Sequence, residues 1–184
     1  MSSAPSSSAL SSVSAPVGPE SSPSPAEPRL VAVGDLAPNF STRNSHGETM
    51  TLSDLRGAPV LLVFYPFAFT GICTGELSGI QEQLPQLRAV GARVLAISTD
   101  TMFTLRVFAE QEQLELDLLS DHWPHGAIAS SYGVFDREIG CALRGSFVLD
   151  AGGVVTWRVV NQIGEPRDLA AHLTALAAGQ GVSS

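Results

Sequence analysis

The sequence predicts an α/β fold in which helices flank a mixed central sheet. From residue 30 onward, short apolar runs typical of strands alternate with longer segments of helical periodicity. The runs over 60–65 and 94–98 are separated by a helical pattern, which favours a right-handed parallel βαβ unit. Two later runs flank the Ala-Gly-Gly hairpin signal at 151–153, so we expect them to pair antiparallel.

Each expected element is placed by its residue pattern. A strand needs about four to eight apolar or β-branched residues, whereas a helix needs about ten or more with a period near 3.6. We expect strands over 60–65, 93–98, 144–149 and 154–161. We expect helices over 72–89, 102–113 and 167–178, and a shorter one over 125–132.

The chain divides into a tail and one domain. Residues 1–28 are mostly serine, proline and alanine, and such a segment buries too little apolar surface to offset its ordering entropy, so we expect a disordered tail. A docking or transit segment is the alternative, but no arginine precedes Arg29, which disfavours a transit peptide. Of the 184 residues 44% are hydrophobic, enough for one core, so we expect a single domain over 29–180.

Composition excludes several classes of function. The formal net charge is −8 and the pI is about 4.8, so the basic footprint of a nucleic-acid or anionic-membrane binder is absent. No apolar run approaches the roughly 18 residues of a membrane span. Two cysteines are too few for a disulfide-rich secreted scaffold, so we expect a cytoplasmic location. All ten cationic residues are arginine, so any side-chain cation in the site is arginine or histidine.

A candidate nucleophile lies just after the first apolar strand. That strand ends at Pro66, a polar turn follows, and a helical pattern begins near Cys73. A helix N-terminus carries about half a positive charge and stabilises a thiolate. The alternative is that Cys73 is an inert packing residue, because free cysteines are among the most buried residues.

The spacing of Pro66, Thr70 and Cys73 resembles the Pro-x-x-x-Thr-x-x-Cys active-site signature of the peroxiredoxins. Three further segments, 34–40, 51–57 and 144–150, resemble the family in the same order, and the match extends over about 31–178. Segments 64–73 and 120–126 look most like the alkyl hydroperoxide reductase E type, which is commonly a one-cysteine enzyme. The resemblance implies a thioredoxin-like fold and reduction of hydroperoxides by a cysteine.

The resemblance also implies roles for individual residues. Cys73 would attack the terminal oxygen of a hydroperoxide and become a sulfenic acid. Arg144 would activate the thiolate and orient the peroxide, Thr70 would hydrogen-bond the thiolate and the substrate, and Pro66 would shield the sulfur from water. Arg144 also interrupts an otherwise apolar and small segment, where a charge is costly unless it is paired. The alternative is an arginine on an edge strand in a surface salt bridge.

Two more charged residues have open interpretations. Glu76 lies three residues after Cys73, where a carboxylate favours a helix start, although in the family a glutamate at this offset commonly holds arginine side chains. Arg167 is either the second arginine of that network or a surface residue at a helix start.

The sulfenic acid must be reduced by some thiol. Cys141 is the only other cysteine, and on one extended strand it would point to the face opposite Arg144. The family's alternative resolving position is Ser78 here. We therefore expect a one-cysteine cycle completed by an external thiol or redoxin. A peroxide sensor that passes oxidation to a partner is the competing hypothesis.

Other sites receive less support. A thioredoxin-type dithiol needs a second cysteine at position 76, which is glutamate. His122 and His125 lack further spaced ligands, so we expect no metal and no cofactor. Exposed aromatic residues at 67–69 and Trp123 make a homodimer the expected assembly.

Overall fold

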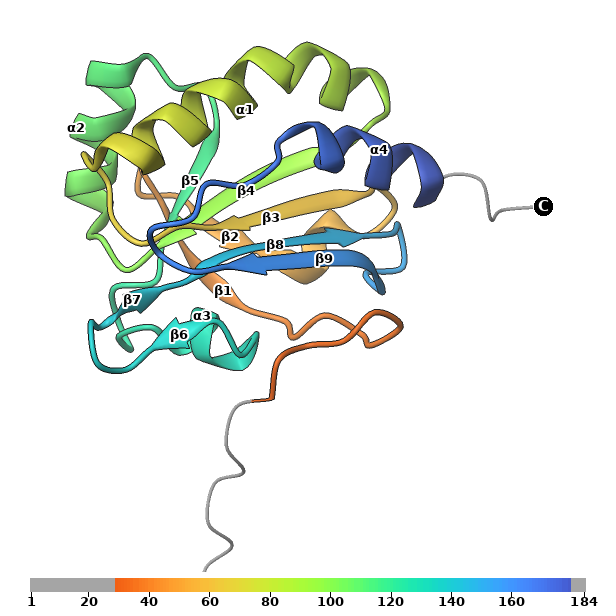
Figure 1. The fold of residues 1–184 in the computed structure, drawn as a ribbon, viewed down its shortest axis with the longest axis horizontal. Coiled ribbons are helices and arrows are strands. Elements are labelled where there is room, and N and C mark those ends of the chain that lie inside the picture. Colours follow the sequence, from red (N-terminus) through yellow and green to blue (C-terminus); the bar gives the residue numbers. More distant parts are fainter. Residues whose placement is uncertain (1–28, 180–184) are drawn as a thin grey trace, which may run out of the picture.

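A seven-stranded mixed sheet forms the centre of the structure, a computed structural model that describes residues 29–179 (Figure 1). Its strand order is β2-β1-β5-β4-β3-β8-β9. The tail predicted over 1–28 lies outside the described residues, as does residue 180. Between residues 29 and 179 no helix has the length and apolar character needed to span a bilayer.

The elements follow one another in the alternation that the sequence predicts. The sheet consists of β1 (Ser41–Asn44), β2 (Thr49–Thr51), β3 (Val60–Phe64), β4 (Arg93–Ser98), β5 (Asp117–Ser120), β8 (Arg144–Leu149) and β9 (Val155–Asn161). The helices are α1 (Gly71–Ala89), α2 (Met102–Glu112), α3 (Ala127–Ser131), α4 (Ala170–Gly179) and a 3₁₀ turn (Leu52–Leu55). A separate two-stranded sheet pairs β6 (Phe135–Asp136) with β7 (Cys141–Ala142).

The pairing of the four predicted strands is confirmed. β3 and β4 pair parallel and are connected by α1. β8 and β9 pair antiparallel and are connected by the predicted hairpin. β3 also pairs antiparallel with β8, and Val63 lies opposite Ser146. This pairing brings the end of the strand before Cys73 beside the start of the strand that carries Arg144.

The central strands divide the core into two layers because they are buried on both faces. Leu61, Val63 and Tyr65 pack against the α1, α2 and α4 side, whereas the alternate residues Leu62 and Phe64 pack against the α3 side. Figure 1 shows α1, α2 and α4 above the sheet and α3 with β6 and β7 below it. The layer under α1 and α4 is the one that contains the candidate site.

The structure corrects the expectation for Cys141. Cys141 and Arg144 do not share one extended strand, because Cys141 belongs to β7, which pairs with β6, whereas β8 pairs with β3 and β9. The Gly145 amide donates to the Leu143 carbonyl at 2.9 Å, which marks a tight turn between the two strands. The prediction that Cys141 points away from the face of Arg144 was therefore wrong in its premise, because the two residues do not lie on one continuous strand.

Candidate active site

Cys73 is the third residue of α1, directly above the end of β3. Thr70 is the N-cap residue, and its carbonyl accepts the amide of Thr74 at 2.9 Å. Cys73 is a free cysteine, fully buried, and it packs with Tyr65, Ala68 and Leu77. The thiol therefore lies in the first turn of a 19-residue helix, where unpaired N–H groups and the helix dipole favour negative charge.

A hydrogen bond from Ala68 to Asp100 holds the middle of the loop over 66–70, which leads into α1. The Ala68 amide donates to Asp100 Oδ2 at 2.8 Å, and the Ser98 hydroxyl donates to the same oxygen at 2.8 Å. The Thr70 hydroxyl donates to the Phe67 carbonyl at 3.1 Å. The bond expected from Thr70 to the sulfur is thus replaced in this conformation by a bond within the loop. Asp100 ties the loop to the end of β4.

Glu76 lies one helical turn after Cys73, and its carboxylate holds both arginines. Arg144 Nη1 donates to Glu76 Oε2 at 2.6 Å, and Arg167 Nη2 donates to the same oxygen at 2.7 Å. The backbone amide of Arg167 donates to the other oxygen, Oε1, at 2.7 Å. The three side chains are 5%, 2% and 0% exposed for Glu76, Arg144 and Arg167, so this is a buried ion cluster.

The electrostatics of the cluster follow from its burial and its charges. Burial alone would raise the pKa of Glu76, but the hydrogen bonds and charge of Arg167, together with the charge of Arg144, hold that pKa below the ordinary value. Two guanidinium groups and one carboxylate leave a net charge of +1 inside the layer under α1. An added anion, such as a thiolate, would be stabilised there.

Backbone carbonyls hold the two guanidinium groups in place. Arg144 Nε donates to the Ile163 carbonyl at 2.6 Å. Arg167 Nη1 donates to the Phe64 carbonyl at 2.9 Å and to the Gly145 carbonyl at 3.2 Å. Arg144 lies on an interior strand and is buried, which does not fit an edge-strand surface arginine. Arg167 is likewise buried and does not lie at the surface.

Two further polar residues complete the buried cluster, and the sequence analysis did not identify them. Ser146 Oγ accepts from Arg167 Nη1 at 3.2 Å, and His172 Nε2 lies 3.0 Å from the same hydroxyl. Burial and the neighbouring Arg167 charge lower the pKa of His172 to about 4. Alternation along β8 would have placed Ser146 on the face of Arg144, but no local pattern indicates His172.

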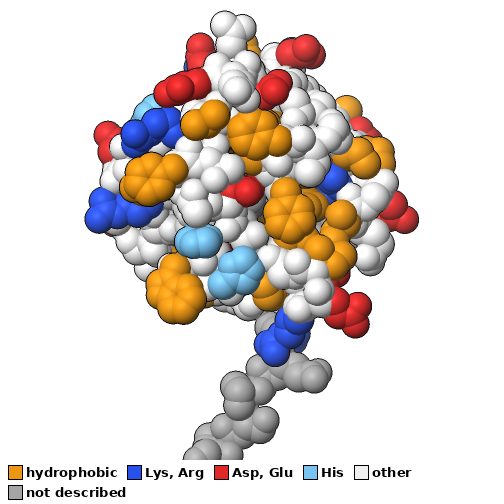
Figure 2. All heavy atoms as spheres, turned by 90° about the vertical axis from the view of Figure 1, so that its left-hand side faces the viewer, with side chains coloured by type: hydrophobic (Ala, Val, Ile, Leu, Met, Phe, Trp, Pro, Cys, Tyr) orange, Lys and Arg blue, Asp and Glu red, His pale blue; other side chains and the backbone are white. Residues whose placement is uncertain are grey.

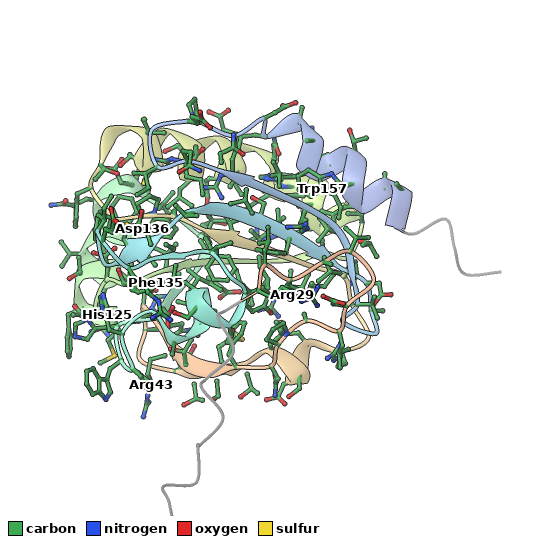
Figure 3. The ribbon with its side chains drawn as sticks, turned by 60° about the horizontal axis from the view of Figure 1, so that its bottom comes forward. Arg29, Arg43, His125, Phe135, Asp136 and Trp157 are labelled. Carbon is green, nitrogen blue, oxygen red and sulfur yellow. The ribbon has the colours of Figure 1, made fainter. Side chains whose placement is uncertain are left out.

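Cys141 is buried on β7, outside the seven-stranded sheet. Burial raises the pKa of the Cys141 thiol to about 11, and negative charge on Asp136 and Cys73 adds to the shift. Nearby, His125 Nε2 lies 2.8 Å from the Gly140 carbonyl, and its ring packs edge-on against Phe135 (Figure 3). Burial is thus the main cause of the raised pKa of Cys141, and the thiol is close enough to Cys73 for charge on one sulfur to affect the other.

The two histidines His122 and His125 each contact a backbone carbonyl. His122 Nδ1 lies 3.3 Å from the Thr99 carbonyl, so each ring has a backbone partner. No group of three or more metal-ligating side chains occurs among residues 29–179. Trp123, between the two histidines, is 84% exposed.

The face that carries the N-terminus of α1 also carries exposed apolar side chains. Figure 2 views this face, and hydrophobic side chains are scattered over it around a recessed centre. The exposed large hydrophobic residues are Phe69 and Ile72 at the start of α1, Phe103 and Val107 on α2, Trp123 between β5 and α3, and Ile139 between β6 and β7.

Comparison with known proteins supports a specific family. Residues 33–158 match the model of the AhpC/TSA family. Alkyl hydroperoxide reductase E of Mycobacterium tuberculosis is 43% identical over 150 residues, which cover 81% of this chain and 98% of that protein. Peroxiredoxin Bcp of Escherichia coli is 38% identical over 128 residues, 66% of this chain and 81% of that protein.

Solved structures agree with the fold. Peroxidoxin BcpB from Mycobacterium tuberculosis superposes with a TM-score of 0.71 at 30% identity and covers 83% of this chain and 98% of its own. Enterococcus faecalis AhpC superposes with a TM-score of 0.76 over 82% of this chain and 93% of its own, and at 24% identity it bears on the fold alone. The predicted α/β, thioredoxin-like fold is confirmed.

Proposed function

This chain belongs to the AhpC/TSA family of thiol-dependent peroxidases, and we propose that it reduces hydrogen peroxide, organic hydroperoxides or both by a one-cysteine cycle on Cys73. The observation that carries the proposal is the position of Cys73 in the first turn of α1, one turn before the carboxylate that holds Arg144 and Arg167. An inert packing cysteine would leave this costly buried ion cluster without a purpose.

In the proposed reaction the Cys73 thiolate attacks the terminal oxygen of ROOH. The S–O bond forms as the O–O bond breaks, sulfur loses two electrons, and the leaving alkoxide takes a proton to become ROH. One external thiol then displaces water from the sulfenic acid and forms a mixed disulfide. A second external thiol then attacks the external sulfur of the mixed disulfide, so that the Cys73 thiolate is released and the two external thiols form a disulfide.

Ionisation alone accounts for little of the required acceleration. An unperturbed cysteine is about 3% thiolate at pH 7, so complete ionisation gains about thirtyfold, or about 2 kcal/mol. Enzymatic accelerations commonly exceed about a millionfold. Fixed donors at the peroxide oxygens must supply the remainder, and we assign this role to Arg144 and Thr70, with Pro66 excluding water. Glu76 and Arg167 hold Arg144 in place.

Access to the sulfur requires motion. Cys73 is fully buried, and a hydroperoxide is larger than a water molecule, so a covering segment must move before reaction. We assign this motion to the loop over 66–70. Phe69 in that loop has a left-handed φ of 62°, which costs a non-glycine residue about 1 kcal/mol or more, and its side chain is 48% exposed.

Resolution by an external thiol or redoxin follows from the state of Cys141. Both cysteines are free, and the raised pKa of Cys141, about 11, keeps it protonated and a poor nucleophile. The proposal thus rests on the protonated state of Cys141 and no longer on a strand shared by Cys141 and Arg144. A one-domain protein over 29–180, a cytoplasmic location and a homodimer formed through the apolar face complete the proposal.

Rapid mixing with one equivalent of peroxide, followed by mass spectrometry, tests the proposal. Wild type and Cys141→Ser should form sulfenic acid at residue 73 and consume peroxide, while Cys73→Ser should consume none. Undiminished consumption by Cys73→Ser would overturn the assignment, and a Cys73–Cys141 disulfide in wild type would overturn the one-cysteine cycle. Steady turnover with a thiol reductant distinguishes a peroxidase from a sensor, which would stop after one oxidation.

A further inference from the structure

His172 is a buried polar residue that the proposed reaction does not use. It lies on α4, is fully buried, and shares its inward face with Ala175 and Leu176. Its Nδ1 makes no hydrogen bond with any residue of 29–179. A buried, unpaired ring nitrogen costs about 1–3 kcal/mol, so a leucine would pack this position more favourably. Packing alone therefore does not account for a histidine here.

The direction of the hydrogen bonds explains what the other ring nitrogen does. Arg167 has only donors, so its Nη1 makes Ser146 Oγ an acceptor. The hydroxyl proton of Ser146 then needs a separate acceptor, and His172 Nε2 lies 3.0 Å away. Neutral His172 accepts there, which turns the oxygen lone pairs of Ser146 toward Arg167. A protonated ring would instead donate to that oxygen and would leave the Ser146 hydroxyl proton without this acceptor.

Burial is the main cause of the lowered pKa of His172, the charge of Arg167 adds to it, and the carboxylates of Glu76 and Asp168 act against it. The charged groups that act on it are Arg167 and Asp168 from the segment before α4, and Glu76 from α1. The neutral ring of Trp157 on β9 packs edge-on against His172 at 5.9 Å between centroids, and Figure 3 shows Trp157 beside α4.

We propose that His172 is a positioning residue of the peroxidase site, which fixes Arg167 through the Ser146 hydroxyl and thereby fixes the Glu76–Arg144 pair next to Cys73. This inference rests on the proposed function. The chain of contacts runs from His172 to Ser146, from Ser146 to Arg167, and from Arg167 through Glu76 to Arg144. When the acceptor at position 172 is lost, the serine hydroxyl is free to rotate and Arg167 loses one of its fixed partners.

The test measures the second-order rate constant for oxidation of Cys73 by hydrogen peroxide, by rapid quench and mass spectrometry. His172→Leu and Ser146→Ala should each lower it about tenfold, as expected when one buried hydrogen bond is lost from the reactive arrangement. His172→Gln keeps an acceptor near the position of Nε2 and should restore the rate to within about threefold of wild type. The double variant His172→Leu with Ser146→Ala should be no slower than either single variant.

A matched control separates positioning from packing. Leu176→Ala removes a buried side chain from the same face of α4, so it should lower the melting temperature and leave the rate constant at 25 °C unchanged. A folded His172→Leu variant with the wild-type rate, or His172→Gln no faster than His172→Leu, would overturn the role of His172. If His172→Leu does not fold, Ser146→Ala decides, because a wild-type rate in that variant equally overturns the role. A wild type that is not oxidised at Cys73 overturns the proposed function instead.

Discussion

Glu76 is the residue on which the whole buried cluster depends. Its two oxygens accept four hydrogen bonds, all from Arg144 and Arg167. When one member of a buried ion pair is removed, the uncompensated charge that remains costs more than the pair contributes. The negative member of this cluster is therefore more critical for folding than either positive member.

Replacing Glu76 with glutamine should destabilise the protein by about 3–5 kcal/mol, because two buried guanidinium groups lose their counter-charge. Urea unfolding followed by circular dichroism measures the change. Glu82→Gln is the control, since Glu82 is exposed on the same helix, and its effect should stay within about 0.5 kcal/mol. Equal effects of the two changes would contradict this interpretation of the cluster.

The Cys141 thiol should be far less reactive in the folded protein than in the unfolded chain. Burial raises the pKa of its thiol to about 11, so at pH 8 almost none is thiolate. In the Cys73→Ser variant, alkylation of Cys141 by iodoacetamide at pH 8 should be at least about tenfold slower in buffer than in urea. Rapid alkylation in buffer would show that Cys141 is available as a resolving thiol.

At the scale of elements, the loop before α1 depends on a bond to the end of β4. Asp100 accepts the Ala68 amide and the Ser98 hydroxyl, and neither contact involves the sulfur. Asp100→Ala should therefore free the loop without changing the cluster around Glu76.

The consequence is faster opening over 66–70. In Asp100→Ala, hydrogen exchange of a peptide that contains Ala68 should accelerate, and alkylation of Cys73 should become faster because the sulfur is more often uncovered. Asp100→Asn retains an acceptor oxygen and should resemble wild type. Unchanged exchange in Asp100→Ala would mean that another contact closes the loop.

The packing of α4 should respond to pH through His172. The pKa of His172 falls from the ordinary 6.5 to about 4 on folding. Between these two pH values the unfolded chain therefore binds a proton at His172 that the folded chain does not bind. The contribution of neutral His172 to the free energy of unfolding is complete above about pH 6.5. It is lost as the pH falls toward 4, by at most about 1.4 kcal/mol per pH unit.

His172→Gln carries no titrating group and should lose less stability between pH 7 and pH 5 than wild type. Urea unfolding at pH 7 and at pH 5 gives the free energy of unfolding of both proteins. The effects of the carboxyl groups, which the two proteins share, cancel when the two losses are compared. Equal losses would show that His172 titrates normally.

At the scale of the whole molecule, the apolar face around the N-terminus of α1 predicts association. Trp123 is 84% exposed and Phe69 is 48% exposed, on a chain of net charge −8 that otherwise favours solubility. Analytical ultracentrifugation should give twice the 19.3 kDa mass of one chain, and Trp123→Ser should shift the equilibrium toward the monomer. A monomeric wild type at about 100 µM would exclude a stable homodimer.

The sequence predicted those parts of the molecule that have long, uniform patterns. β3, β4, β8 and β9 were expected to within one residue at each end, because each is a sustained apolar or alternating run. β1, β2 and β5 were missed, because three or four residues carry too little periodicity to identify a strand. Strand pairing, which depends on distant segments, completes the sheet around them.

The same limit applies to the site. Pro66, Thr70 and Cys73 are neighbours in one loop, so their spacing is legible in the sequence. The pairing of Glu76 with Arg167 was one of two alternatives, and the sequence did not decide between them because the two residues are 91 positions apart. The turn at Leu143, which separates Cys141 from the strand of Arg144, also depends on tertiary pairing.

The bond from Arg167 to the Phe64 carbonyl joins positions 103 residues apart. During synthesis, the segment that bears Cys73 leaves the ribosome long before α4 does, so the nascent chain holds a thiol without its guanidinium neighbours. The thiol should therefore gain its full reactivity toward peroxide only after Arg167 has been synthesised and has folded against Phe64. A ribosome-stalled chain that ends near residue 160 should react with peroxide only as fast as an ordinary cysteine, and a chain extended well beyond residue 179 should react faster.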